Sequence, residues 1–169
     1  LPIILYNVPG RTGSNVMPAT IARIAREVST VVAVKEASGS INQMMEIINE
    51  VAKNGPKNFT VLAGDDAIAL PLIAVGGKGC ISVVCNEVPK LFSDMVHFAL
   101  SGDLEKAKKL HYSMLDLMNL NFIESNPIPV KTALAKMGLI EESLRLPLTF
   151  IEEKNRPLVE KALKELKLI

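Results

Sequence analysis

The chain has 169 residues, of which 49% are hydrophobic and 22% charged, and its formal net charge at pH 7 is +1. It is too apolar to be a disordered chain and long enough to form a packed domain. Because charges of both signs are interspersed, the chain offers no basic face for nucleic acid and no acidic tail, so small-molecule partners are expected.

Neither the apolar stretches nor the cysteines indicate a membrane or secreted protein. The longest apolar stretch, residues 67–84, is broken by Pro71 and three glycines, so it does not predict a membrane-spanning helix. Cys80 and Cys85 would lie on one strand, about 16 Å apart, which is too far for a disulfide. Two free thiols favour a reducing compartment, and we expect a cytoplasmic protein.

Short apolar segments alternate with helical patterns along the first hundred residues. The four predicted strands are residues 3–8, 31–35, 59–63 and 80–85. The helical patterns that follow them begin near Pro18, at a capping box formed by Ser40 and Gln43, at Asp65, and at Pro89. Strands separated by amphipathic helices predict parallel βα units.

Beyond Gly102 only helical patterns remain. They cover an apolar stripe from Leu104 to Met118, a second helix after residues 126–130, and a third from Pro157 to Ile169. The sequence therefore predicts a βα array over residues 1–102 and a helical domain over residues 103–169. Four parallel units do not close a barrel, and an open sheet would expose two apolar edges. We expect an α/β fold that forms the C-terminal portion of a larger barrel, whose first half lies upstream.

Lys35 is the strongest candidate for a reactive group. It ends an apolar strand and is followed by a turn that contains serine and glycine. Burial disfavours the ammonium form of a lysine and leaves a nucleophilic amine, which Schiff-base chemistry with a carbonyl substrate requires. The alternative is a strand-capping lysine whose amine extends into solvent.

Tyr6 is the expected neighbour of Lys35. Strand alternation places Ile4 with Tyr6, and Ala33 with Lys35. If these are the inward faces of adjacent parallel strands, Tyr6 and Lys35 end side by side at the carboxyl rim, where barrel enzymes place their sites. A phenol beside an amine can transfer protons during carbinolamine formation and dehydration. Otherwise Tyr6 is an ordinary aromatic residue at the edge of the sheet.

The turn after Tyr6 presents Arg11 on the same rim, where its planar fork of donors suits a carboxylate. The alternative is a solvated arginine in a loop. Gly64 closes the third strand and would let a ligand approach the backbone closely.

Other polar residues are weaker candidates. For Asp65 and Asp66, helix capping is favoured over acid–base catalysis. His97 and His111 lie on predicted helices away from any cluster of ligands, so no metal site is expected.

Five segments together resemble the dihydrodipicolinate synthase family, also called 4-hydroxy-tetrahydrodipicolinate synthases. They are residues 6–13 (YNVPGRTG), 34–38 (VKEAS), 64–66 (GDD), 76–83 (GGKGCISV) and 126–131 (NPIPVK). They follow the order of the family's C-terminal half across nearly the whole chain. The resemblance implies a (β/α)8 TIM barrel, here its last four βα units with a C-terminal three-helix domain. It also implies a homotetramer that acts in lysine and diaminopimelate biosynthesis.

The resemblance also assigns roles to individual residues. Lys35 matches the lysine that forms a Schiff base with pyruvate, and Tyr6 the tyrosine that relays protons there. Arg11 matches the arginine that holds the carboxylate of L-aspartate 4-semialdehyde, while Gly64 and Ile81 match positions lining the pyruvate pocket. The implied lyase reaction passes through an enamine that attacks the aldehyde, followed by cyclisation. No metal or organic cofactor is implied.

Parts of the family's site belong to its N-terminal half: a pair of threonines, a second relay tyrosine and most of a lysine-feedback site. We therefore expect this chain to be inactive without that half. Two alternatives stay open. N-acetylneuraminate lyases and keto-deoxy-sugar-acid aldolases share the tyrosine and the lysine, although Arg11 favours the synthase because a polyol supplies no carboxylate at that position. The other alternative is a non-catalytic half-barrel that folds only with a partner.

Overall fold

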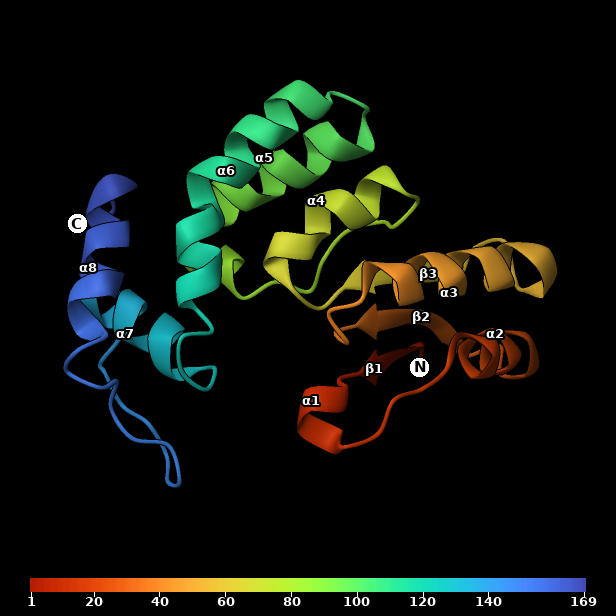
Figure 1. Cartoon of the computed structure of the whole chain (residues 1–169), viewed down its shortest axis with the longest axis horizontal. Helices are drawn as coiled ribbons and strands as arrows, with labels where there is room; N and C mark the ends of the chain where they lie inside the picture. Colours follow the sequence, from red (N-terminus) through yellow and green to blue (C-terminus); the bar gives the residue numbers. More distant parts are fainter. The chain divides into compact units, whose positions relative to one another are not determined.

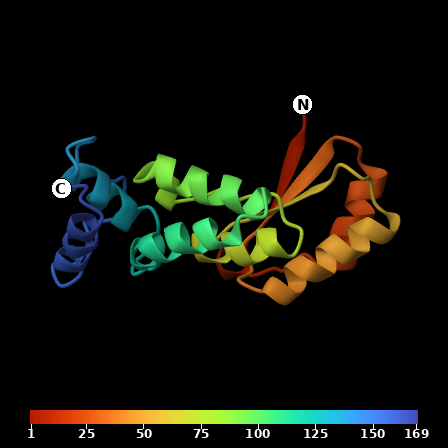
Figure 2. The ribbon, with the colours of Figure 1, turned by 90° about the horizontal axis from the view of Figure 1, so that it is seen from above.

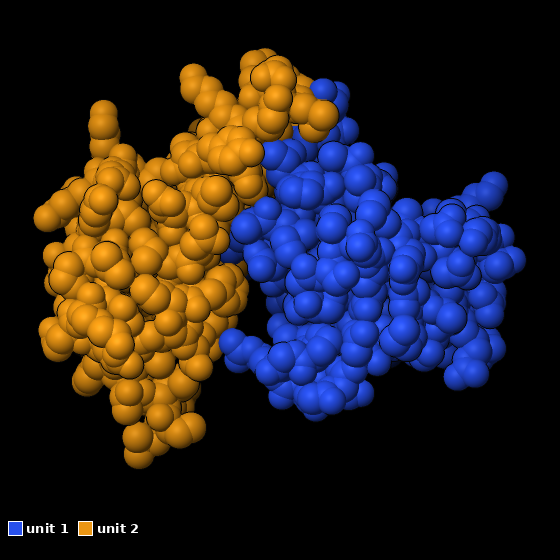
Figure 3. Space-filling view, viewed as in Figure 1, with its two compact units in different colours: residues 1–82, 99–102 blue, residues 83–98, 103–169 orange.

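The computed structural model describes residues 1–169, which form two compact units. Unit 1 consists of residues 1–82 and 99–102, and unit 2 consists of residues 83–98 and 103–169 (Figure 3). Residues 83–98 therefore group with the C-terminal helices. The domain border expected after residue 102 stays a prediction.

Unit 1 is built on a three-stranded parallel sheet in the order β1–β2–β3 (Figure 1). The strands are β1 (Ile3–Asn7), β2 (Val31–Glu36) and β3 (Thr60–Ala63). Aliphatic and β-branched residues dominate all three strands, as expected for a sheet that is covered by helices. The predicted α/β class with parallel strands is confirmed, and each of these strands lies within one residue of its predicted bounds.

Two amphipathic helices cover one face of this sheet. They are α2 (Pro18–Glu27) and α3 (Ile41–Asn54), which pack against each other and against the strands (Figure 2). Their buried residues recur at helical spacing, for example Met44, Ile47 and Val51 on α3. Unit 1 also contains the one-turn helix α1 (Pro9–Thr12) and the apolar helix α4 (Asp66–Ala74).

Side-chain caps determine where α3 and α4 begin. Ser40 Oγ accepts a hydrogen bond from the Gln43 backbone N–H at 3.2 Å, and Asp65 accepts one from Ala67 N–H at 2.9 Å. The predicted capping role of Asp65 is confirmed. The reciprocal half of the predicted capping box is wrong, because Ser40 N–H donates to Ser38 Oγ at 3.3 Å and the Gln43 oxygen accepts from Asn15 Nδ2 at 2.9 Å. The Gln43 NH₂ group donates to the Glu36 carboxylate at 3.1 Å.

The predicted fourth strand, residues 80–85, is wrong over most of its length. Cys80 forms a single parallel bridge with Ala63, and Ile81 N–H donates to Ala63 O at 2.9 Å. The chain then enters the short 3₁₀ helix η1 (Val84–Asn86). A short buried apolar run does not by itself distinguish a strand from a buried turn, which explains the error.

Unit 2 contains helices but no strand. After η1 come α5 (Pro89–Leu100), whose last residues belong to unit 1, and then α6 (Leu104–Leu120), α7 (Ile128–Lys136) and α8 (Arg156–Glu165). The expectation of helices alone beyond Gly102 is confirmed, although α8 ends at Glu165 rather than at Ile169. No helix of the chain is both long enough and apolar enough to cross a bilayer.

The Cys80 thiol lies against a buried carboxylate. Its Sγ is 3.6 Å from Asp66 Oδ1 and 3.8 Å from the Asp65 carbonyl oxygen. Burial, followed by the negative charge of Asp66, raises the pKa of the Cys80 thiol well above its ordinary value. The thiol is therefore held in its neutral form in the folded chain.

This raised pKa predicts a loss of stability at alkaline pH. The folded-state pKa of Cys80 exceeds the unfolded value of about 8.5. The stability that the neutral thiol contributes is therefore fully present below about pH 8.5 and is lost as the pH rises above it. Urea denaturation should show that Cys80→Ala loses less free energy of unfolding than the unchanged chain between about pH 8 and 10. Between about pH 6 and 7 the difference between the two proteins should stay constant, which is the control. If the free energies of unfolding of the two proteins differed by the same amount at every pH from about 6 to 10, the raised pKa of Cys80 would be contradicted.

Candidate active site

The pairing of β1 with β2 brings Tyr6 and Lys35 together. The two residues are direct partners in the parallel register, and Lys35 Nζ lies 4.3 Å from the centroid of the Tyr6 ring. This distance places the amine over the aromatic face, in the range of a cation–π contact. The predicted juxtaposition of the two side chains is confirmed.

Lys35 is only half-buried within this chain. Strand alternation places it on the face of the sheet opposite Val34 and Glu36, which belong to the helix-covered side. On the face of Lys35, the side chains of Ile4 and Tyr6 remain 46% and 52% exposed. The desolvation expected around the amine is therefore partial in the chain as it stands.

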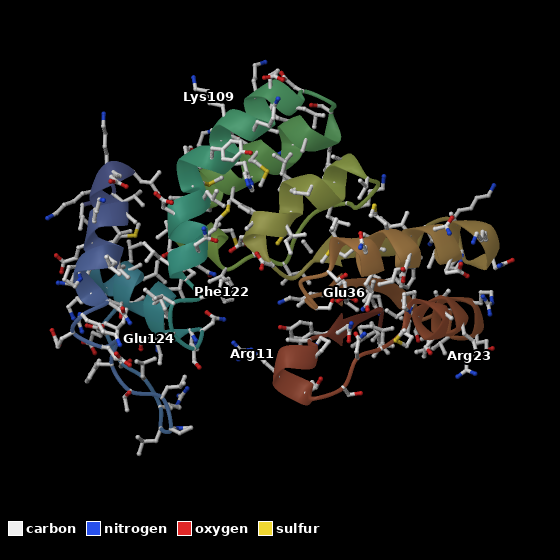
Figure 4. The ribbon with its side chains drawn as sticks, in the orientation of Figure 1. Arg11, Arg23, Glu36, Lys109, Phe122 and Glu124 are labelled. Carbon is white, nitrogen blue, oxygen red and sulfur yellow. The ribbon has the colours of Figure 1, made fainter.

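Arg11 belongs to the one-turn helix α1 rather than to an irregular turn. The helix ends at Gly13, which has a left-handed φ of 68° and donates its N–H to Pro9 O at 2.9 Å. Arg11 is exposed and forms no salt bridge within the chain. Figure 4 shows Arg11 on α1, which follows β1 directly. Its guanidinium is therefore available to a ligand.

Gly64 and Ile81 both lie next to the carboxyl end of β3. A Cβ atom on Gly64 would come within 2.5 Å of the Ala37 Cβ, and its N–H donates to Glu36 O at 2.8 Å. Glycine is required here because two strand ends approach each other closely. Ile81 is held beside β3 by its hydrogen bond to Ala63 O. The pocket-lining roles of the two residues stay predictions.

The sequence analysis missed a polar network on the other face of the sheet. Its centre is Glu36, which is completely buried, and its partner on β1 is Asn7, which is 2% exposed. Asn7 Nδ2 donates to both carboxylate oxygens of Glu36, at 3.0 and 2.8 Å. The signal was present in the sequence, since alternation places Glu36 on the same face as Val34, where a charged residue is unexpected.

The expectation that His97 and His111 form no metal site stays a prediction. No group of three or more His, Cys, Asp or Glu side chains is arranged to hold a metal ion. His111 is buried on α6, and burial lowers its pKa, whereas His97 lies on α5 near Ser93.

Comparison with known proteins shows relatives along nearly the whole chain. The model of the dihydrodipicolinate synthetase family matches residues 1–166. The 4-hydroxy-tetrahydrodipicolinate synthase of Methanocaldococcus jannaschii is 50% identical over 169 residues, which are 100% of this chain and 56% of the relative. That of Koribacter versatilis is 52% identical over 160 residues, 95% of this chain and 52% of the relative. The chain thus spans about half the length of the curated relatives that it matches.

Solved structures agree with this relationship. The dihydrodipicolinate synthase of Thermotoga maritima superposes with a TM-score of 0.97 at 44% identity, covering 100% of this chain and 57% of the other. A monomeric dihydrodipicolinate synthase variant gives the same TM-score and identity and covers 100% of this chain and 56% of the other. On the evidence of sequence and fold together, the chain belongs to the dihydrodipicolinate synthetase family.

Proposed function

We propose that this chain supplies the Schiff-base lysine of a 4-hydroxy-tetrahydrodipicolinate synthase. In the assembled enzyme, pyruvate and L-aspartate 4-semialdehyde condense to 4-hydroxy-tetrahydrodipicolinate, a step of lysine and diaminopimelate biosynthesis. The single observation that carries the proposal is the Lys35 amine, 4.3 Å from the Tyr6 ring centroid, at the carboxyl ends of two parallel strands. Its support is the 50% identity to a named synthase along the whole chain.

The proposed architecture is half of a (β/α)8 TIM barrel with a C-terminal helical domain. Within unit 1, the helix-free face of the sheet carries Tyr6 and Lys35, and its side chains are partly exposed. A complementary half-barrel would bury this face and close the sheet edges. We propose residues 1–102 as the barrel portion and residues 103–169 as the helical domain. A cytosolic homotetramer is the assembly we propose for the complete enzyme. The absence of a disulfide at Cys80 and Cys85 supports the compartment.

The proposed mechanism starts at the Lys35 amine. The amine adds to the ketone carbon of pyruvate, and loss of water gives an imine. The Tyr6 hydroxyl transfers the protons that addition and dehydration require. Removal of a methyl proton gives the enamine. Its carbon attacks the aldehyde carbon of the second substrate, so that the imine forms again and the aldehyde oxygen takes up a proton to become a hydroxyl. The amine of that substrate then attacks the imine carbon, which closes the ring and releases Lys35.

Arg11 serves the second substrate in this proposal. Its guanidinium is exposed and can form paired hydrogen bonds with the carboxylate of the semialdehyde. No metal or organic cofactor takes part in the proposed chemistry, because the imine itself acts as the electron sink. Complete catalysis needs the complementary half, since Lys35 is only half-buried in this chain.

Lys35→Ala should abolish covalent capture of pyruvate. The test is borohydride reduction of this chain, co-expressed with the N-terminal half of the Methanocaldococcus jannaschii relative, followed by intact mass and peptide mapping. The unchanged protein should carry one reduced pyruvyl group on Lys35. Lys78→Ala, which removes an exposed lysine of the same unit, should still be labelled. An adduct that persists after Lys35→Ala would overturn the assignment.

Arg11→Ala should weaken use of the aldehyde far more than use of pyruvate. Charge-assisted hydrogen bonds are worth about 1.5–3 kcal/mol, so the KM for the aldehyde should rise roughly tenfold to a hundredfold. The KM for pyruvate should change less than about twofold, because the substitution removes no contact with pyruvate. Arg23→Ala, on the exposed side of α2, is the matched control (Figure 4). Equal losses for both substrates would make Arg11 a structural residue.

A further inference from the structure

We propose that Glu36 is a positioning residue, which holds the strand ends of Lys35 and Tyr6 and the base of the Arg11 segment in one arrangement. This inference rests on the proposed function for its catalytic consequence. Its structural basis is the hydrogen-bond network around the buried Glu36 carboxylate on the opposite face of the sheet, in which Glu36 is the only charged member. Figure 4 labels Glu36.

Every contact of the Glu36 carboxylate is with a neutral donor. Oε1 accepts from Ser38 N–H at 2.7 Å and from Asn7 Nδ2 at 3.0 Å. Oε2 accepts from Asn7 Nδ2 at 2.8 Å and from Gln43 Nε2 at 3.1 Å. A buried carboxylate satisfied by several donors binds them more strongly than a neutral acceptor would. The carboxylate therefore joins β1, β2, the turn after β2 and the first turn of α3.

This contact lies directly behind the reactive pair. Asn7 and Glu36 are partners in the β1–β2 register, one position beyond Tyr6 and Lys35. Neighbouring strand residues point to opposite faces, so the hydrogen bonds on one face set the height and register of the side chains on the other. The Asn7–Glu36 contact thus fixes where the Lys35 amine lies relative to the Tyr6 ring.

The same network closes the segment that carries Arg11. Asn7 Oδ1 accepts from Val16 N–H at 3.1 Å, and Asn7 Nδ2 donates to Asn15 Oδ1 at 2.9 Å. Residues 8–16 therefore form a loop that begins after Asn7, the last residue of β1, and is hydrogen-bonded back to Asn7 at its other end. Asn15 also exchanges two hydrogen bonds with Gln43, at 2.9 and 3.0 Å. A displacement of Asn7 would move both ends of the Arg11 segment.

Glutamine cannot replace Glu36 without a mismatch. Each carboxylate oxygen faces two donors, so a glutamine NH₂ at either position would meet an N–H group. Ser38 contributes its backbone N–H, which cannot be reversed. Asn7 cannot turn over either, because its Oδ1 is needed by Val16 N–H. Glu36→Gln therefore removes the charge while keeping the shape, and it disrupts the contact with Asn7.

The reciprocal exchange of the two residues should restore the contact. In Asn7→Asp/Glu36→Gln, the carboxylate at position 7 accepts from Val16 N–H and from the new glutamine NH₂. The glutamine oxygen still accepts from Ser38 N–H. The Asn15 and Gln43 amides can turn together, which preserves the two hydrogen bonds between them. The turned Asn15 amide then donates to the new carboxylate at position 7, and the turned Gln43 oxygen accepts from the new glutamine NH₂ at position 36. The charge count of the network is unchanged in this variant.

The test uses the co-expressed assembly and two labels mapped by peptide mass. With pyruvate and borohydride, Glu36→Gln should slow labelling of Lys35 about tenfold or more, because small displacements of a reacting group cost large factors in rate. With formaldehyde and borohydride, which need no active site, methylation of Lys35 should become about threefold or more faster, because the amine is released from the Tyr6 ring. Lys78 serves as the internal reference and should be unaffected.

The controls separate positioning from general destabilisation. Glu46→Gln removes an exposed carboxylate of α3 and should change neither label. The reciprocal variant should recover at least half of the pyruvate labelling rate lost in Glu36→Gln. Unchanged labelling in Glu36→Gln, or equal acceleration of methylation at Lys35 and Lys78, would overturn the positioning role. If no protein captures pyruvate, the proposed function fails, and the methylation label still decides the role of Glu36.

Discussion

The register between β1 and β2 is the constraint on which the candidate site depends. It pairs Tyr6 with Lys35 on one face of the sheet and Asn7 with Glu36 on the other. Because side chains alternate along a strand, a slip of one residue would exchange the two faces, sending the lysine among the helices and the glutamate to the open face. The site is therefore a consequence of strand pairing rather than of any single side chain.

Different interactions stabilise the two faces of the sheet. Aliphatic residues of α2 and α3 cover one face, and within that apolar layer a lone carboxylate is accommodated only where its hydrogen bonds are complete. Leaving such a charge buried without its partners costs roughly 3–5 kcal/mol, which penalises any other register that keeps Glu36 among the helices. The opposite face holds a lysine and a tyrosine that are partly open to solvent. A rigid polar contact thus supports a face that stays accessible to substrate.

The sequence predicted the parts of this arrangement that depend on local patterns. Alternation within β1 and β2 was sufficient to place Tyr6 beside Lys35, and the capping role of Asp65 followed from its position before an apolar helix. The parts it missed depend on contacts distant in sequence. Gln43 matched a capping box, but its side-chain oxygen accepts from Asn15 and its NH₂ group donates to the buried Glu36 carboxylate. The apolar run at residues 80–85 lacked a signal to separate one β-bridge from a full strand.

The central claim is that Lys35 becomes covalently bound to pyruvate, with Tyr6 beside it and the Asn7–Glu36 contact behind it. The most direct measurement is a crystal structure of the co-expressed assembly after reduction with borohydride in the presence of pyruvate. We predict continuous density from Lys35 Nζ to the central carbon of the pyruvyl group, with the Tyr6 ring still against the amine and the network intact. Density for the adduct on another lysine, or an unmodified Lys35 turned away from Tyr6, would contradict the account.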